Sequence, residues 1–151
     1  MVISELCQRD VVTVHASDEL VGAAELMRQK HVGYLIVVEP ERSGPGTRVA
    51  GVLTDRDIVV TVVARGVDAR SLTVGDVMTR NPVTVAESDP LDRVLVQMRR
   101  AGVRRVPVVG AHNQLAGILA LDDVIDALSD ELQNIASSMR NERRIEGTLR
   151  P

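Results

Sequence analysis

The hydrophobic residues of this chain are arranged in short runs and in helical stripes. Residues 35–38 and 106–109 are unbroken apolar runs of strand length, a pattern typical of strands that are buried on both faces. Each run follows a stretch whose apolar residues recur at steps of three and four, up to Met27 or Met98, which predicts an amphipathic helix before each strand. The two halves of the chain therefore show the same order of elements.

A second apolar run follows in each half, at residues 49–54 and 115–120. Both runs lead into segments that contain Asp, and we expect helices to begin near Asp55 and Asp122. A short β-branched strand stands in front of each half. The pattern thus predicts a β-α-β-β-α unit that occurs twice.

A direct comparison of the halves indicates an internal duplication. Residues 11–18 (VVTVHASD) match residues 82–89 (PVTVAESD) at an offset of 71 residues. The offset holds without a gap over residues 3–38, and 12 of these 36 pairs are identical. Two unrelated stretches of average composition would share roughly two or three residues.

Further along the chain the offset falls to 66, which pairs Gly51 with Gly117, because the first copy has five more residues. These extra residues fall in the stretch 41–48, whose Gly and Pro predict a surface loop. A unit of about 60 residues has a thin core by itself, so we expect an α/β (α+β) fold in which two repeats pack face to face with pseudo-two-fold symmetry. The predicted bounds are 1–66 for repeat one, 67–128 for repeat two and 129–151 for a C-terminal helical extension.

The motifs inside these repeats resemble a known family. The segments V-T-V (12–14), G-V-L-T-D-R-D (51–57) and G-V-R-R-V-P-V-V (102–109) are similar, in their order and duplication, to tandem CBS domains, which are named from cystathionine β-synthase and together form a Bateman module. The resemblance covers about residues 1–128. It implies a cleft between the repeats that binds an adenine-containing ligand, such as AMP, ATP, S-adenosylmethionine or sometimes NAD or NADH.

The resemblance also implies a regulatory module rather than an enzyme, in which ligand binding is transmitted as a conformational change. A homodimer and a regulated protein partner are expected for the same reason. Two alternatives stay open: a structural interaction protein whose ligand sites have degenerated, and redox signalling through bound NAD(H) or Cys7.

The first candidate site is the helix start that follows residues 49–54. Thr54 stands at the N-cap position, where a hydroxyl and free backbone N–H groups can meet a phosphate. The resemblance places a ribose-binding carboxylate three residues later, at Asp57, and Arg56 between them is a weaker candidate. Thr54 and Asp57 also fit a simple capping box, with Asp in the place that Glu usually holds.

Repeat two departs from this motif. It keeps the carboxylate as Asp123, but Ala120 replaces the Thr, so the second site is expected to hold a nucleoside, to bind a nucleotide differently, or to be empty. Arg104 and Arg105 match basic residues that reach ligand phosphates in the family, and bidentate contacts from Arg to phosphate are strong. Because the repeats face each other, we expect Arg105 to complete the site of repeat one, whereas a solvated position at the strand edge suits Arg104 equally well.

The strands in front of each repeat supply the remaining candidates. In the family these strands border the adenine, although the residues at these positions here fit an ordinary strand equally well. With one Tyr, no Phe and no Trp in the chain, an adenine would lie between aliphatic side chains and be recognised by backbone groups. The candidates are Val12, Thr13, Val83 and Thr84.

Composition excludes several other functions. The net charge of −3 and the presence of only one aromatic residue argue against nucleic-acid modules that attract polyanions or stack bases. The three His residues and Cys7 lack the spacing of metal ligands, so we expect no metal other than Mg²⁺ accompanying a nucleotide. The single Cys and the absence of a signal peptide or membrane-length apolar run predict a cytoplasmic protein without membrane contact.

The C-terminal segment continues the last predicted helix as an amphipathic stripe. We expect this helix to pack on the module or across a dimer. Contact with nucleic acid is a minor alternative, because Glu142 and Glu146 interrupt the basic residues that follow the stripe. The stripe consists of Ile125, Leu128, Leu132, Ile135 and Met139, and the basic residues are Arg140, Arg143, Arg144 and Arg150.

Overall fold

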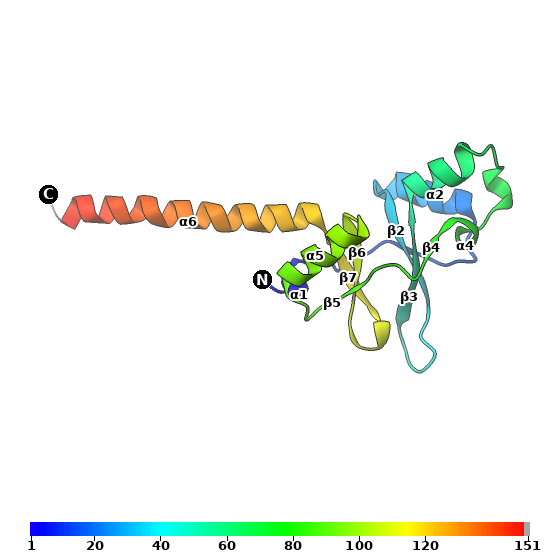
Figure 1. Cartoon of the computed structure of the whole chain (residues 1–151), viewed down its shortest axis with the longest axis horizontal. Coiled ribbons are helices and arrows are strands. Elements are labelled where there is room, and N and C mark those ends of the chain that lie inside the picture. Colours follow the sequence, from blue (N-terminus) through cyan, green and yellow to red (C-terminus); the bar gives the residue numbers. More distant parts are fainter. Residues whose placement is uncertain (150–151) are drawn as a thin grey trace.

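The computed structural model describes residues 1–149 and contains two small β-sheets that lie side by side (Figure 1). The strands are β1 (Thr13–Val14), β2 (Tyr34–Pro40), β3 (Thr47–Thr54), β4 (Thr79–Arg80), β5 (Val85–Ala86), β6 (Arg105–Val109) and β7 (Leu115–Ala120). The first sheet has the order β1-β2-β3-β4 and the second has the order β5-β6-β7. In both sheets the first pair of strands is parallel and the next is antiparallel, so the two sheets repeat one plan.

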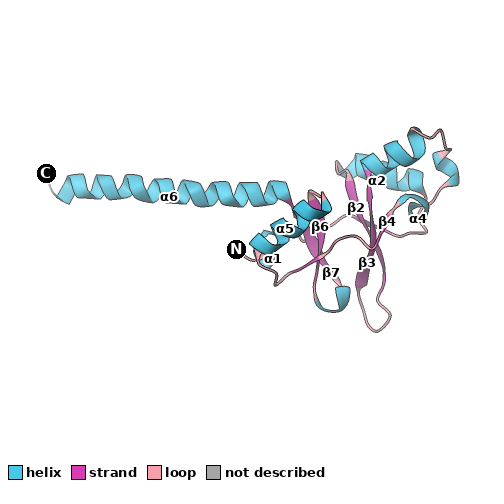
Figure 2. Ribbon diagram, viewed as in Figure 1, coloured by secondary structure: helices cyan, strands magenta, loops and turns pink. Residues whose placement is uncertain are grey.

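The helices are distributed between the two sheets in the same way. Figure 2 shows α2 (Leu20–Lys30) and α4 (Val74–Val77) beside the first sheet, and α1 (Ile3–Leu6) and α5 (Leu91–Ala101) beside the second. The remaining elements are α3 (Asp55–Ile58), its π-helical continuation η1 (Val59–Val63), the 3₁₀ turns η2 (Ala69–Ser71) and η3 (Ala111–Asn113), and α6 (Leu121–Leu149). The predicted β-α-β-β-α order is thus confirmed in both halves.

The hydrophobic pattern explains why these segments form these elements. β2 and β6 carry the two apolar runs, and their central residues are buried, as expected for strands covered on both faces. Each long helix of the repeats turns one apolar stripe toward its sheet. The buried stripe residues are Leu20, Ala23 and Met27 in α2, and Leu91, Val94 and Met98 in α5.

The repeats exchange their N-terminal segments. Ile3 of α1 is buried in the core of the second sheet, whereas Val74 of α4 is buried in the core of the first. The exchanged chain passes so close to β3 and β7 that a Cβ atom at Gly51 would lie 2.6 Å from the carbonyl oxygen of Thr79, and one at Gly117 would lie equally close to that of Gln8. These two glycines are therefore required by the close approach of backbone, and the exchange ties the repeats together.

The two sheets meet through apolar side chains from both repeats. Ile36, Val38 and Val49 of the first sheet are buried at this junction. Val109 and Ile118 of the second sheet pack against them. The junction agrees with two repeats that pack face to face, and it sets the segment that precedes β1 beside β6 and β7.

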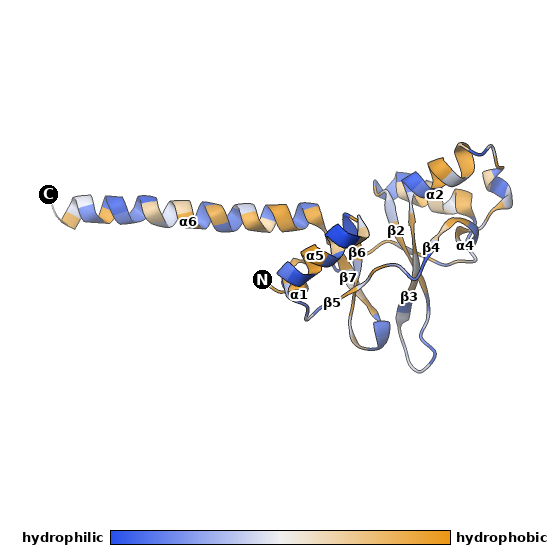
Figure 3. Cartoon of the chain, in the orientation of Figure 1, coloured by the Kyte–Doolittle hydropathy of each residue, from blue (hydrophilic) through white to orange (hydrophobic). Residues whose placement is uncertain are grey.

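The C-terminal extension is part of a single helix, α6, which projects away from the module (Figure 1). Val124 in its first turn is buried in the second core, but the large apolar residues that follow it are exposed. Of the two expected placements of the extension, packing on its own module is wrong for residues 128–149, because no element of the described chain covers that part of α6. Packing across a dimer stays a prediction. Figure 3 shows hydrophobic and hydrophilic bands alternating along it, while Arg150 lies outside the described residues.

None of the helices within residues 1–149 combines the length and the apolar character that crossing a membrane requires.

Candidate functional site

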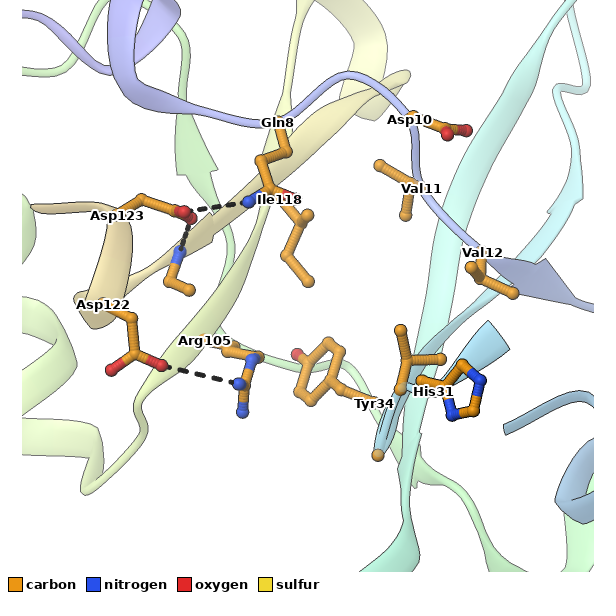
Figure 4. Close-up of a pocket in the computed structure, with 13 residues that line it drawn as sticks. Gln8, Asp10, Val11, Val12, His31, Tyr34, Arg105, Ile118, Asp122 and Asp123 are labelled. Atoms are coloured by element: carbon orange, nitrogen blue, oxygen red, sulfur yellow. Dashed lines mark hydrogen bonds and ion pairs between the residues drawn. The ribbon is translucent and has the colours of Figure 1, made fainter. Parts of the chain in front are cut away.

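A cavity of about 360 Å³ opens at the junction of the two repeats (Figure 4). Repeat one contributes the segment before β1, the end of α2 and the start of β2, while repeat two contributes β6, β7 and the start of α6. The lining residues are Gln8, Asp10, Val11, Val12, His31, Val32, Gly33, Tyr34, Arg105, Ile118, Ala120, Asp122 and Asp123. Both repeats are therefore needed to form its walls.

The aliphatic wall is held by backbone pairing. Val11 and Val12 immediately precede β1, which is parallel to β2, and the carbonyl of Val12 accepts a hydrogen bond from the Ile36 amide at 3.3 Å. Ile118 of β7 lines the cavity from the other repeat (Figure 4). A flat apolar group that enters here contacts aliphatic side chains from both repeats.

The carboxylate of Asp123 is fixed at the base of α6. It accepts a hydrogen bond from the backbone N–H of Ala120 at 3.3 Å and another from the side-chain amide of Gln8 at 2.8 Å. Gln8 is itself anchored, because its backbone N–H and C=O both pair with Ile118 at 2.9 Å. The exchanged N-terminal segment thus places an amide donor directly on the carboxylate.

Arg105 supplies the cationic group of the cavity. In the β6–β7 register its Cα lies opposite Ala120, so its side chain stays beside the start of α6 and comes within 3.7 Å of Asp122. Arg104 also contacts Asp122, at 3.4 Å, but its side chain is 75% exposed against 44% for Arg105. Of these two arginines, Arg105 lines the cavity and Arg104 does not.

Tyr34 occupies the place in repeat one that Arg105 occupies in repeat two. The two residues are related by the offset of 71, and Figure 4 shows them next to each other in the cavity. Burial raises the pKa of the Tyr34 hydroxyl, and the carboxylate of Asp57 adds to this, while Arg105 opposes it. The phenol therefore stays neutral near pH 7 and can donate a hydrogen bond.

The helix start of repeat one forms a closed capping box. The Thr54 hydroxyl accepts a hydrogen bond from the Asp57 N–H at 3.0 Å, and the Asp57 carboxylate accepts one from the Thr54 N–H at 2.9 Å. Neither residue lines the cavity, and Arg56 between them is exposed. The capping-box alternative describes this geometry.

The structure thus brings together three of the ten predicted site residues, Val12, Arg105 and Asp123. Arg105 lines the cavity beside the carboxylates of its own repeat, because antiparallel pairing with β7 sets it beside the start of α6. The charges of Arg105 and Asp57 both act on the pKa of Tyr34, and the expected grouping of Arg105 with Thr54 and Asp57 stays a prediction. The remaining predicted residues, Thr13, Thr54, Arg56, Asp57, Val83, Thr84 and Arg104, lie outside the cavity lining.

The strand candidates outside the cavity have identifiable positions. Thr13 lies in β1 beside Leu26 and Gln29 of α2, on a different surface hollow. Val83 and Thr84 stand just before β5, and the Val83 side chain is exposed. Their binding roles remain predictions.

Sequence reasoning missed several lining residues, above all Gln8, Tyr34 and Asp122. The offset of 71 carries the signal for Tyr34, since it aligns with Arg105. Asp122 is the neighbour in sequence of Asp123, which the motif predicts as a site residue. Gln8 carries no such signal, because it reaches Asp123 only through the exchange of the N-terminal segments.

The chemistry of the cavity is that of a binding site. Its polar groups are three carboxylates, one guanidinium, one amide, one imidazole and one neutral phenol, placed around aliphatic walls. Within residues 1–149, no group of three or more His, Cys, Asp or Glu side chains is arranged to hold a metal ion. The donors and acceptors present suit a ligand with an apolar ring, hydroxyl groups and an anionic substituent.

Comparison with known protein families agrees with the repeated architecture. The CBS domain family model matches the chain twice, at residues 3–64 and 74–130. The chain belongs to the CBS domain family. Its α/β fold is therefore a tandem CBS pair that carries a long C-terminal helix.

Two curated relatives extend this comparison of the CBS pair. Hypoxic response protein 1 of Mycobacterium tuberculosis is 32% identical over 120 residues, which cover 80% of this chain and 80% of that protein. An uncharacterized protein of Methanopyrus kandleri is 29% identical over 82% of this chain. The chain matches only 60% of the length of that second relative.

A solved structure of similar fold contains a ligand. A CBS domain protein from Pyrobaculum aerophilum, complexed with AMP, superposes with a TM-score of 0.70 and is 28% identical. The match covers 82% of this chain and 89% of the other.

Proposed function

We propose that this CBS pair is a regulatory, non-catalytic module that binds an adenine-containing ligand of the AMP class in the cavity between its repeats. The observation that carries the proposal is that Val12 of repeat one and Arg105 and Asp123 of repeat two line one cavity. Its volume of about 360 Å³ lies within the range of small-molecule sites. The AMP bound by the similar protein from Pyrobaculum aerophilum supports the same class of ligand.

Asp123 is the proposed acceptor for the ribose hydroxyls. An ionised carboxylate has only acceptor oxygens, and two adjacent hydroxyls can donate to both of them. One of these oxygens now accepts the Gln8 amide at 2.8 Å. Ligand binding therefore requires the Gln8 side chain to turn away or to share the carboxylate.

Arg105 is the proposed partner of the 5′ substituent. Its guanidinium is 3.7 Å from Asp122, longer than a hydrogen bond, so it can be redirected toward a phosphate and contact it with two N–H donors. Asp10, Asp122 and Asp123 line the same cavity. Because three carboxylates repel added negative charge, we expect AMP to bind more tightly than ATP, and S-adenosylmethionine to be the alternative ligand.

The proposed signal is a change in the relative position of the repeats. A ligand in the cavity contacts the segment before β1 from one repeat and the start of α6 from the other. If its affinity differs between two arrangements of the repeats, binding shifts the population toward one of them. A regulated protein partner then responds to that shift, and we further propose that the module acts as a homodimer.

A ligand titration tests this function. Thermal unfolding followed by circular dichroism suits a chain without Trp, and AMP, adenosine, ATP, NADH, S-adenosylmethionine and GMP form the panel. A hundredfold excess of AMP over its Kd should stabilise the protein by about 2.7 kcal/mol, and GMP should not. Asp123→Asn should remove most of this stabilisation, whereas Asp57→Asn, the same change in the other repeat, should preserve it.

The second candidate function is an interaction module whose ligand sites have degenerated. It is favoured by the lack of a hydroxyl at Ala120 and by the hydrogen bonds that already engage Asp123 and the Thr54–Asp57 pair. In that case no member of the panel stabilises the protein. Loss of AMP stabilisation in Asp57→Asn, with Asp123→Asn unaffected, would instead assign the site to repeat one.

A further inference from the structure

Helix α6 exposes a regular apolar seam outside the module. Ile125, Leu128, Leu132, Ile135 and Met139 follow one another at steps of three, four, three and four residues. All five are exposed, including Ile125 at 63% and Leu132 at 67%. Burying such a seam against a partner is favourable, since each large apolar side chain that leaves water contributes about 1.5–3 kcal/mol.

The spacing of the seam identifies the kind of partner. Two positions in every seven carry a large apolar side chain over residues 125–139, a repeat of 3.5 residues that keeps one narrow face toward a second helix, as in the seam of a coiled coil. A helix that packs on a globular core normally shows a wider apolar face. The narrow face therefore favours another helix as the partner of α6.

We propose that α6 pairs with α6 of a second copy of this chain, as an antiparallel two-stranded coiled coil. The seam extends over residues 125–139. It ends there because the next position in the pattern is Glu142. In an antiparallel pair the two kinds of seam position face each other, which sets Leu132 against Ile135, and Leu128 against Met139, of the other copy. This alignment gives four of the five seam residues an apolar partner, while Ile125 of each helix faces Glu142 of the other at the two ends of the seam.

Charge decides the orientation of the pair. The first eleven residues of α6 carry five carboxylates and no Lys or Arg, while its later part has three Arg and two Glu. A parallel pair would set the five carboxylates of one helix beside those of the other. An antiparallel pair sets them beside the basic part, so attraction replaces repulsion.

Solution mass tests the pairing. Sedimentation equilibrium of the full chain should give twice 16.4 kDa. Leu132→Asp should shift the mass to that of a monomer, because a carboxylate in the seam would be buried without a partner. Val63→Asp is the matched control, since Val63 of η1 is equally exposed, at 68%, and lies outside the seam. Circular dichroism verifies that each variant is folded.

The outcomes of the mass measurement are distinct. A dimer that persists in Leu132→Asp overturns the proposal, as does a wild-type chain that is a monomer. A dimer that dissociates in Val63→Asp but not in Leu132→Asp places the interface on the exposed valines of η1 and also overturns it. A folded, monomeric Leu132→Asp beside a dimeric Val63→Asp supports the pairing.

Disulfide formation tests the orientation. Leu128→Cys and Met139→Cys are made separately in a Cys7→Ala background, and the two proteins are mixed and mildly oxidised. An antiparallel pair should give a covalent dimer in the mixture, while each variant alone should not cross-link, because its two copies of the new Cys lie about 16 Å apart along the helix axis. Cross-linking of each variant with itself would establish a parallel pair and overturn the antiparallel one.

Discussion

The two repeats begin their last helices with related residues, yet the two helix starts differ in what they leave available. In repeat one, Thr54 and Asp57 bond reciprocally to each other's backbone N–H groups and lie outside the cavity lining. In repeat two, Ala120 has no hydroxyl, and Asp123 lines the cavity while it accepts the Gln8 amide. The repeat with the complete motif is therefore the one whose polar groups satisfy each other.

A complete motif and an accessible site are therefore separate properties of a repeat. A hydroxyl that caps its own helix stabilises the fold. A ligand that binds this hydroxyl must compete with the backbone N–H group that already donates to it. A carboxylate that borders a cavity has only to exchange one partner for another. Substitutions that change the residues of one helix start and leave the other intact test this distinction.

The largest expected effect comes from the cationic side chain. Arg105→Gln should weaken AMP binding about tenfold or more, because hydrogen bonds to charged groups contribute about 1.5–3 kcal/mol. Isothermal titration calorimetry with AMP and with adenosine measures it, and adenosine binding should change little. Arg104→Gln is the control, since that side chain lies outside the cavity lining. An equal loss of AMP affinity in both variants would mean that Arg105 acts only through its positive charge and not through direct contact with the phosphate.

Thr54→Ala should lower the free energy of unfolding by about 1 kcal/mol, because α3 loses the hydroxyl that accepts the Asp57 N–H. Urea denaturation measures this stability. AMP affinity should stay within twofold of the wild type, since Thr54 does not line the cavity. Lost AMP binding at unchanged stability would reverse the roles assigned to the two repeats.

Gln8→Ala should raise AMP affinity by about fivefold, since it removes a competitor for Asp123 that contributes about 1 kcal/mol. Thr79→Ala, at the equivalent position of repeat two, serves as the control and should leave affinity unchanged. Calorimetry with AMP again gives the result. Weaker binding in Gln8→Ala would show that the amide supports the ligand instead of competing with it.

The smallest effect is expected for Ala120→Thr, which adds to repeat two the hydroxyl found in repeat one. It should stabilise the protein by a few tenths of a kcal/mol up to about 1 kcal/mol, because Asp123 already accepts the Ala120 N–H and the hydroxyl completes a capping box. Urea denaturation of the variant beside the wild type tests it. A lower stability would show that the start of α6 has no room for the side chain.

The fold was predictable from the sequence because it rests on local patterns that occur twice. The unbroken runs at residues 35–38 and 106–109 became buried strands, and the stripes that end at Met27 and Met98 became the helices that cover them. The loop is slightly shorter than the predicted stretch 41–48, because β2 extends to Pro40 and β3 starts at Thr47.

The cavity was harder to predict because its composition depends on contacts between distant segments. Arg105 and Asp123 were recognised from motifs, but their grouping follows from the β6–β7 register. Gln8 reaches Asp123 only because residues before β1 cross to the other repeat. No pattern within one repeat encodes such an exchange. Likewise, the stripe of α6 predicted a helix but not whether it would fold back on the module.

The position of α6 gives the module a mechanical property. The helix starts at the wall of the cavity, with Asp122 and Asp123, and its 29 residues extend about 43 Å at 1.5 Å per residue. A tilt of about 5° at its first turn would move its far end by about 4 Å. A helix of this length would therefore enlarge a side-chain adjustment around the proposed ligand into a displacement of about 4 Å at its far end.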